Sequence, residues 1–161
     1  MTPEHITLAD YLGPYRNHDD VTLEVENNAQ ALLDRVNVLI DRMDLDGVPI
    51  IENPITRSLV SGTQNGGFRP QACPIGAARS KHKTGNGVDV YDPQRALATW
   101  AVNNLDVLQE LGLYIEDPRW TPTWLHLQDL PPGNPPNPAR TVFIPDASRP
   151  KAAALPGQVV A

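Results

Sequence analysis

Residues 80–89 read SKHKTGNGVD and place an imidazole, His82, seven positions before a carboxylate, Asp89. Residues 87–91 alternate in polarity, which predicts a short strand whose two valines face the core. Asp89 would then project from the other face of a stiff strand. The two glycines of the stretch would give the preceding loop the freedom to bring His82 beside it.

A second alternating segment lies downstream at residues 123–128, where Trp124, His126 and Gln128 share one face of the expected strand. Zinc binds imidazole nitrogen and carboxylate oxygen, and catalytic zinc sites use three protein ligands and a water. We therefore predict that His82, Asp89 and His126 bind one Zn²⁺ ion. Two neutral imidazoles and one carboxylate leave a net charge near +1, which lowers the pKa of a bound water toward ~7.

Each of these three residues also has an ordinary structural alternative. His82 suits a solvated loop, His126 suits a hydrogen-bonded position in a strand, and Asp89 suits a turn that its carboxylate caps. His5 and His18 lie in a polar N-terminal region, and we expect both to be exposed to solvent.

Length and composition favour a single domain over residues 1–146, followed by a Pro/Ala-rich tail at 147–161. The net charge of -6 and the pI of about 5.0 disfavour binding to nucleic acid or to an anionic membrane surface. Cys73 is the only cysteine, so no internal disulfide can form. We expect no membrane span, because no apolar run approaches ~20 residues. No signal peptide is visible, which predicts a cytoplasmic protein.

Hydrophobic periodicity predicts an α+β fold with a small antiparallel sheet and two main helices packed on it. The first helix is expected over residues 22–43, capped by Asp20 or Thr22, and its buried stripe comprises Leu32, Val36, Leu39, Ile40 and Met43. The second is expected to start at Asp92-Pro93 and to stop at Gly112. Further strands are expected at 55–62, 113–115 and 141–144. The glycine- and proline-rich loop 62–79 is expected to shape a site.

The first motif has the form Ser-x-His-x-x-Gly-x-small-x-Asp, and a Trp-x-His motif follows far downstream. Together they resemble the zinc D-alanyl-D-alanine carboxypeptidases and L-alanyl-D-glutamate endopeptidases, which include phage endolysins and share the hedgehog/DD-peptidase fold. The matching residues are Ser80, His82, Gly85, Gly87, Asp89, Trp124 and His126. The resemblance runs over about residues 58–128 and includes an upstream segment with Gly67-Phe68-Arg69.

The resemblance implies roles for individual residues. His82, Asp89 and His126 match the zinc ligands. Arg69 matches an arginine that stabilises the developing oxyanion or grips the substrate, a task that suits a permanently charged guanidinium. The alternative for Arg69 is a surface ion pair. We assign Ser80 and Trp124 to substrate binding, and Ser80 also suits support of the metal-binding loop.

One position departs from the family pattern. Many members carry a carboxylate three residues before the last histidine, where it acts as general base, but this chain has Thr123 there. The nearest carboxylates are Glu116 and Asp117, which follow the short strand expected at 113–115. We predict that Glu116 is the base. The alternative is that both are loop carboxylates, in which case zinc is bound without efficient turnover.

The resemblance implies a zinc metallopeptidase that hydrolyses amide bonds in peptidoglycan stem peptides. The small domain without an export signal suits a phage lysis enzyme that reaches the cell wall after release, or a virion-associated hydrolase. A catalytically weak or inactive zinc-binding module of a phage particle is the alternative, and Thr123 favours it. Another amide substrate, such as a D-alanyl dipeptide, also stays open.

Overall fold

The computed structural model describes residues 5–144 and contains a four-stranded sheet in the order β1-β3-β2-β4. Its strands are β1 (Gly87–Tyr91), β2 (Tyr114–Glu116), β3 (Trp124–Gln128) and β4 (Val142–Phe143). β3 pairs antiparallel with both β1 and β2, whereas β4 pairs parallel with β2. The sheet is therefore mixed and not antiparallel as expected, because the chain leaving β3 passes β2 and adds β4 to its far edge. The α+β class is confirmed.

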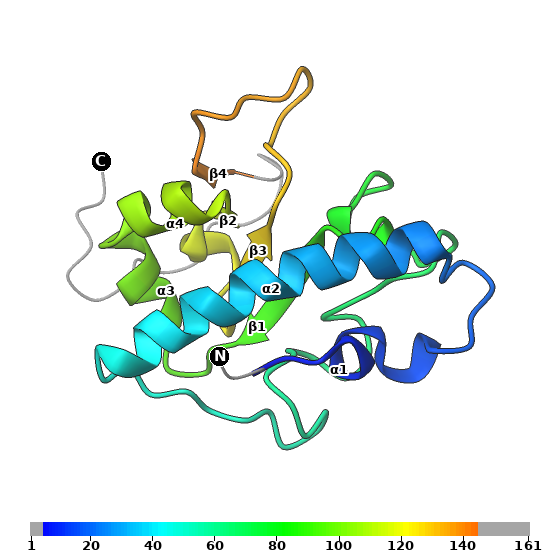
Figure 1. Cartoon of the computed structure of the whole chain (residues 1–161), viewed down its shortest axis with the longest axis horizontal. Helices are drawn as coiled ribbons and strands as arrows, with labels where there is room; N and C mark the ends of the chain where they lie inside the picture. Colours follow the sequence, from blue (N-terminus) through cyan, green and yellow to red (C-terminus); the bar gives the residue numbers. More distant parts are fainter. Residues whose placement is uncertain (1–4, 145–161) are drawn as a thin grey trace.

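The long helix α2 (Leu23–Leu45) covers one face of the sheet (Figure 1). The Thr22 side chain caps it by accepting a hydrogen bond from the Val25 N–H, which selects Thr22 over Asp20. All five residues of the expected apolar stripe are buried. The valines of β1 and the leucines of β3 are buried in the same core. Among the described residues, no helix is both long and apolar enough to cross a membrane.

The N-terminal region forms a short helix, α1 (Leu8–Leu12), followed by a 3-10 turn, η1 (Gly13–Tyr15). A reciprocal pair of hydrogen bonds between Thr7 and Asp10 caps α1. Tyr11 is buried, and its hydroxyl donates to the carbonyl of Gly87 at 3.0 Å. This segment therefore packs against the start of β1. His18 is exposed as expected, but His5 is only partly exposed and lies 3.9 Å from Asp41.

The second expected helix is two helices, α3 (Ala96–Val102) and α4 (Leu105–Leu111). The predicted start at Asp92-Pro93 is wrong, because the helix begins after Arg95, but the carboxylate of Asp92 still accepts from the N–H groups of Leu97 and Ala98 in its first turn. Asn103 and Asn104 interrupt the helical pattern of apolar residues. The Asn104 side chain donates a hydrogen bond to the Trp100 carbonyl at 2.8 Å. Gly112 ends α4 with a left-handed backbone at φ 66°.

The strand expected at 55–62 is irregular. Its one bridge to the sheet joins Val60 to Val90, and the Ser61 N–H donates to the Asp89 carbonyl at 2.8 Å. A turn with Arg57 at φ 56° breaks the extended conformation before this point. Two further 3-10 turns are η2 (Lys81–Lys83) and η3 (Pro118–Trp120). The expected tail at 147–161 lies outside the described residues.

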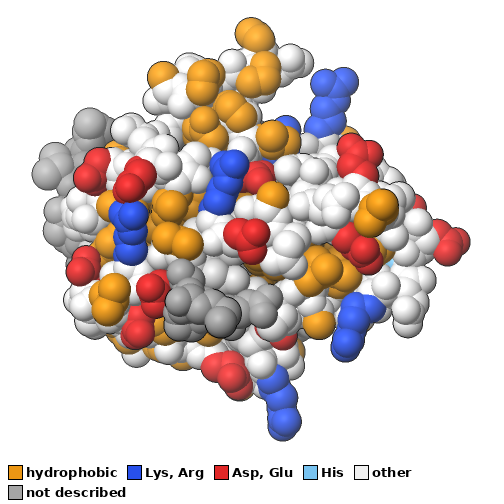
Figure 2. All heavy atoms as spheres, viewed as in Figure 1, with side chains coloured by type: hydrophobic (Ala, Val, Ile, Leu, Met, Phe, Trp, Pro, Cys, Tyr) orange, Lys and Arg blue, Asp and Glu red, His pale blue; other side chains and the backbone are white. Residues whose placement is uncertain are grey.

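Acidic and basic side chains are interspersed over the face formed by α2 (Figure 2). Hydrophobic side chains gather on the loop between β3 and β4, which projects from the body of the molecule (Figures 1 and 2). This loop contains five of the chain's prolines, at positions 131, 132, 135, 136 and 138.

Candidate metal centre

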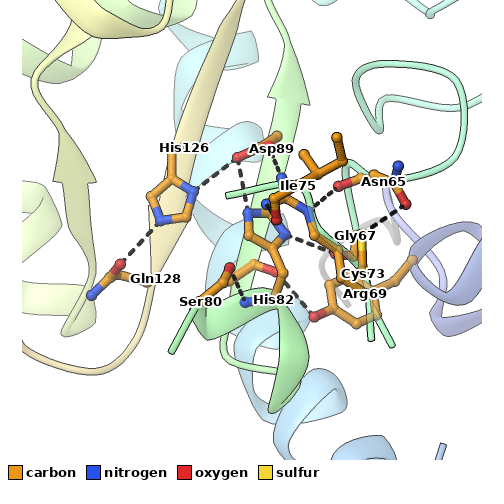
Figure 3. A network of polar contacts seen from close by, with 12 residues as sticks. Asn65, Gly67, Arg69, Cys73, Ile75, Ser80, His82, Asp89, His126 and Gln128 are labelled. Carbon is orange, nitrogen blue, oxygen red and sulfur yellow. Dashed lines mark hydrogen bonds and ion pairs between the residues drawn. The ribbon is translucent and has the colours of Figure 1, made fainter. Parts of the chain in front are cut away.

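Three buried side chains from different elements converge on the sheet face opposite α2 (Figure 3). Asp89 on β1 lies opposite His126 on β3 in the strand register, and His126 Nδ1 is 2.8 Å from Asp89 Oδ1. The turn η2 brings His82 to the same oxygen, with His82 Nε2 at 3.3 Å. One ligand atom from each residue lies within 4.8 Å of the other two. This group could hold a metal ion.

The hydrogen bonds of the outer nitrogens fix which ring nitrogen faces the centre. His82 Nδ1 is 2.7 Å from the carbonyl oxygen of Gly67, which can only accept, so Nδ1 carries the proton. His126 Nε2 is 3.0 Å from Gln128 Oε1. The Gln128 amide is oriented by its own donation to the Leu130 carbonyl at 2.7 Å, so its oxygen must face the imidazole. In the neutral rings, His82 Nε2 and His126 Nδ1 therefore present lone pairs to Asp89.

Three electron-rich atoms, two imidazole nitrogens and one carboxylate oxygen, thus face one point. They repel one another unless a cation or a proton lies between them. Metal-binding histidines usually donate their other N–H to a carbonyl or another acceptor, as both rings do here. Two nitrogen ligands and one oxygen ligand suit several divalent transition metals, zinc included. The residues present thus fit a metal centre, and the solvated-loop alternative for His82 is wrong because this residue is buried.

The charge states agree with this arrangement. Burial lowers the pKa of His82 in spite of the nearby carboxylate. Burial acts in the same direction on His126, but the hydrogen bond and charge of Asp89 outweigh it and raise its pKa. Burial alone would raise the pKa of Asp89, but the two imidazoles hold it well below its usual range. Asp89 is therefore ionised, and a metal ion would compete with a proton for the space beside His126.

Arg69 holds the second oxygen of the same carboxylate. Its Nη2 donates to Asp89 Oδ2 at 3.1 Å, and its Nε donates to the Asn65 carbonyl at 2.7 Å. The residue is only 8% exposed, so the expected alternative of a surface ion pair is wrong: the ion pair exists but is buried. Arg69 thereby orients Asp89 and leaves Oδ1 for the histidines.

Glu116 is the last residue of β2. β2 pairs Tyr114 with Gln128 and Ile115 with Leu127, where its pairing with β3 ends, and strand alternation directs the next residue, Glu116, to the face that carries His126. Glu116 is 8% exposed, and its charge helps to raise the pKa of His126. On the other side Glu116 pairs with Phe143, whose ring meets the His126 ring edge-on at 6.1 Å.

Asp117 is held differently from Glu116. Its carboxylate caps η3 and forms an ion pair with Arg119 at 2.6 Å. Of these two carboxylates, Glu116 and not Asp117 is therefore the one on the face of the metal centre. Thr123, three residues before His126, is exposed.

The two expected substrate-binding residues border the centre. Ser80 Oγ accepts from the His82 N–H at 3.3 Å and so caps the turn that carries His82. Trp124 is half-buried and lies opposite Tyr91, two residue pairs along the register from Asp89 and His126 and on the same face. Tyr91 was not anticipated as a neighbour of the site, although the alternation of residues 87–91 contained that signal. Cys73 is half-buried, with Sγ 3.9 Å from Asn65 Oδ1.

The glycines of the motif have different physical roles. Gly85 has a φ of 84°, which favours glycine, and it packs closely on α2. Gly87 lies in a regular strand, so the expected flexibility does not explain it. A Cβ at Gly87 would lie 3.3 Å from His126 Cε1 and 3.1 Å from Lys81 Cβ. Gly87 therefore provides space for the imidazole.

Comparisons with models of protein families, with curated proteins and with solved structures found no match to this chain. The function is therefore inferred from the residues themselves and from the motifs that they form.

Proposed function

We propose that this chain is a zinc-dependent peptidase of the D-alanyl-D-alanine carboxypeptidase and L-alanyl-D-glutamate endopeptidase type. Its substrate would be an amide bond in a peptidoglycan stem peptide, cleaved during phage lysis or by a virion. The observation that carries the proposal is the buried group of His82, Asp89 and His126, in which both histidine tautomers direct a lone pair at the Asp89 carboxylate. The motifs around these residues supply the peptidase class.

His82 Nε2, Asp89 Oδ1 and His126 Nδ1 would hold the ion. Bound zinc would acidify a water molecule and polarise the substrate carbonyl. The Gly67 carbonyl and the Gln128 amide keep the two imidazole rings oriented. Arg69 keeps the carboxylate aligned, and its fixed charge favours the negative charge that develops on the substrate oxygen.

Glu116 is the general base in this proposal. Its place at the end of β2, where its charge raises the pKa of His126, suits a carboxylate that takes a proton from the attacking water and passes it to the leaving amine. Asp117 is already engaged with Arg119 and is the weaker candidate. Ser80 and Trp124 would contact the stem peptide from the two sides of the centre.

The direct test incubates purified protein with peptidoglycan and with synthetic stem peptides and measures newly released amino groups. We expect release that stops with a chelator and returns with zinc. Glu116→Gln should still bind zinc but lower turnover by about 10²–10⁴-fold, the usual contribution of a general base. Glu110→Gln, at an exposed carboxylate on α4, is the matched control. A fully active Glu116→Gln variant would overturn the assignment of the base.

A second candidate function is a zinc-binding module of a phage particle that does not turn over substrate. Thr123 favours it, because the carboxylate expected at that position is missing. Zinc-loaded protein that leaves peptidoglycan, stem peptides and D-alanyl dipeptides all intact would establish this alternative. Cleavage of the dipeptide alone would instead narrow the substrate to that class.

A further inference from the structure

A cavity of about 520 Å³ lies next to η2, the turn that carries His82, and next to the first turns of α2. Three cationic side chains line it, from Arg79, Lys81 and Lys83, against one carboxylate, from Glu24. The whole chain carries a net charge of -6, so such a concentration of positive charge is unusual for it. Two of the chain's three lysines are the residues on either side of His82.

Lys83 is the most unusual of these cations because it is only 6% exposed. Its Nζ donates to the Gln71 carbonyl at 2.8 Å, and the Gln71 side chain donates back to the Lys83 carbonyl at 3.3 Å. None of the ion pairs found within residues 5–144 includes Lys83. A buried ammonium group without a direct ion pair is costly, and an anionic ligand in the cavity would supply such a partner.

The turn η2 links the cavity to the metal centre, because it carries Lys81 and Lys83 on either side of His82. Ser80 lines the cavity, and its hydroxyl accepts from the backbone N–H of His82. Lys81 Cβ and His126 Cε1 both lie close to the space above Gly87, at 3.1 Å and 3.3 Å from the same point. A peptide anchored in the cavity by a charged group would therefore have its neighbouring residues near the turn that carries His82.

We propose that this cavity binds a carboxylate group of an acidic peptide substrate. The inference rests on the proposed function, because it assigns the cavity to the part of the stem peptide next to the cleaved bond. Stem peptides carry free carboxylates on the γ-linked glutamate and at the C-terminus. Ammonium and guanidinium groups pair with carboxylates through charge-assisted hydrogen bonds. The cavity would thus select acidic stems over amidated ones.

The test measures binding of two synthetic peptides by calorimetry. The first is L-Ala-γ-D-Glu-L-Lys-D-Ala with free carboxylates, and the second has both carboxylates amidated. Zinc-loaded Glu116→Gln protein prevents turnover during the titration. We expect the free acid to bind about ten-fold more tightly, and Lys81→Gln and Arg79→Gln each to remove most of that preference. Lys81→Arg should retain it, and Arg140→Gln, at an exposed cation outside the cavity, should have no effect.

Lys83 is buried and its replacement would also act on folding, so the test uses Lys81 and Arg79. Equal binding of the two peptides, or a preference that survives both substitutions, would overturn the inference. Inorganic phosphate that binds with a dependence on Lys81, when the acidic peptide shows none, would also overturn it and would assign the cavity to phosphate.

The two proposals fail separately. If wild-type protein cleaves acidic and amidated stems equally well, the proposed function stands and the carboxylate subsite is wrong. If wild-type protein cleaves neither peptide but binds the acidic one through Lys81, the subsite stands and the peptidase is wrong.

Discussion

Replacing Gln128 by leucine should weaken zinc binding without removing a ligand. The Gln128 oxygen accepts from His126 Nε2 at 3.0 Å and so keeps the lone pair on Nδ1, which faces Asp89. Leucine has a similar size but cannot accept a hydrogen bond. The imidazole could then take its other tautomer or turn away. Loss of such a partner usually lowers metal affinity by about 10–100-fold.

The affinity loss converts into a loss of stabilisation. With free zinc at about 1,000 times the wild-type Kd, binding should stabilise the native state by about 4.1 kcal/mol. An affinity weakened by about 10-fold or 100-fold leaves about 2.7 or about 1.4 kcal/mol at the same zinc concentration. A domain of this size changes its Tm by about 2–4 °C for each kcal/mol. The zinc-dependent rise in Tm should therefore be smaller in Gln128→Leu by about 3–11 °C.

The assay is thermal unfolding in buffered zinc, with each variant compared with its own metal-free sample. This comparison removes any effect of the substitution on the metal-free fold. Gln128→Glu keeps an acceptor for His126 and should retain most of the zinc-dependent rise. Gln30→Leu, at an exposed position on α2, is the control. A full zinc response in Gln128→Leu would refute the orienting role, and no response in wild type would refute the metal centre.

Three further predictions concern stability. Asp89→Asn should lower the free energy of unfolding by about 3–5 kcal/mol, because it leaves the buried Arg69 guanidinium without its counter-charge; an unchanged urea midpoint would contradict this. Gly67→Ala should cost at least about 1–3 kcal/mol in the same measurement, because its Cβ would meet a backbone oxygen of Tyr11 at 1.9 Å. Burial raises the pKa of Asp92, although backbone N–H groups lower it, so the folded protein holds this proton more tightly than the unfolded chain does. The stability due to this shift is fully present below the ordinary carboxyl pKa, and it is lost as pH rises through the raised pKa of the folded protein. Asp92→Asn should therefore flatten the dependence of the unfolding free energy on pH in that window. Equal pH slopes for wild type and variant would count against this prediction.

The elements with strong periodicity could be predicted from sequence. The stripe of α2 repeats over many turns, and residues 87–91 and 123–128 alternate cleanly, so each pattern determines one buried face. The same alternation placed Asp89 and His126 on faces that could meet. Gln128 shares the face of His126 by that pattern as well, but sequence alone does not show that its amide reaches the ring.

Other features depend on contacts that periodicity does not contain. The apolar positions between residues 92 and 111 suit one helix, but the Asn104 side chain competes for a backbone carbonyl and the helix is divided. The segment 55–62 has the residue types of a strand, yet a turn leaves only a short piece beside β1. The parallel pairing of β4 depends on the path of a proline-rich loop, for which no local signal exists.

The metal centre and the hydrophobic core depend on each other through the strand register. Val88 and Val90 face α2 together with the leucines of β3, and this burial favours one register between β1 and β3. A shift of one residue would move these side chains to the opposite face and would expose the valines. The same shift would separate Asp89 from His126. The hydrophobic burial that stabilises the sheet therefore also fixes the pairing of the two candidate ligands, which is why the site needs no cross-link to hold its geometry.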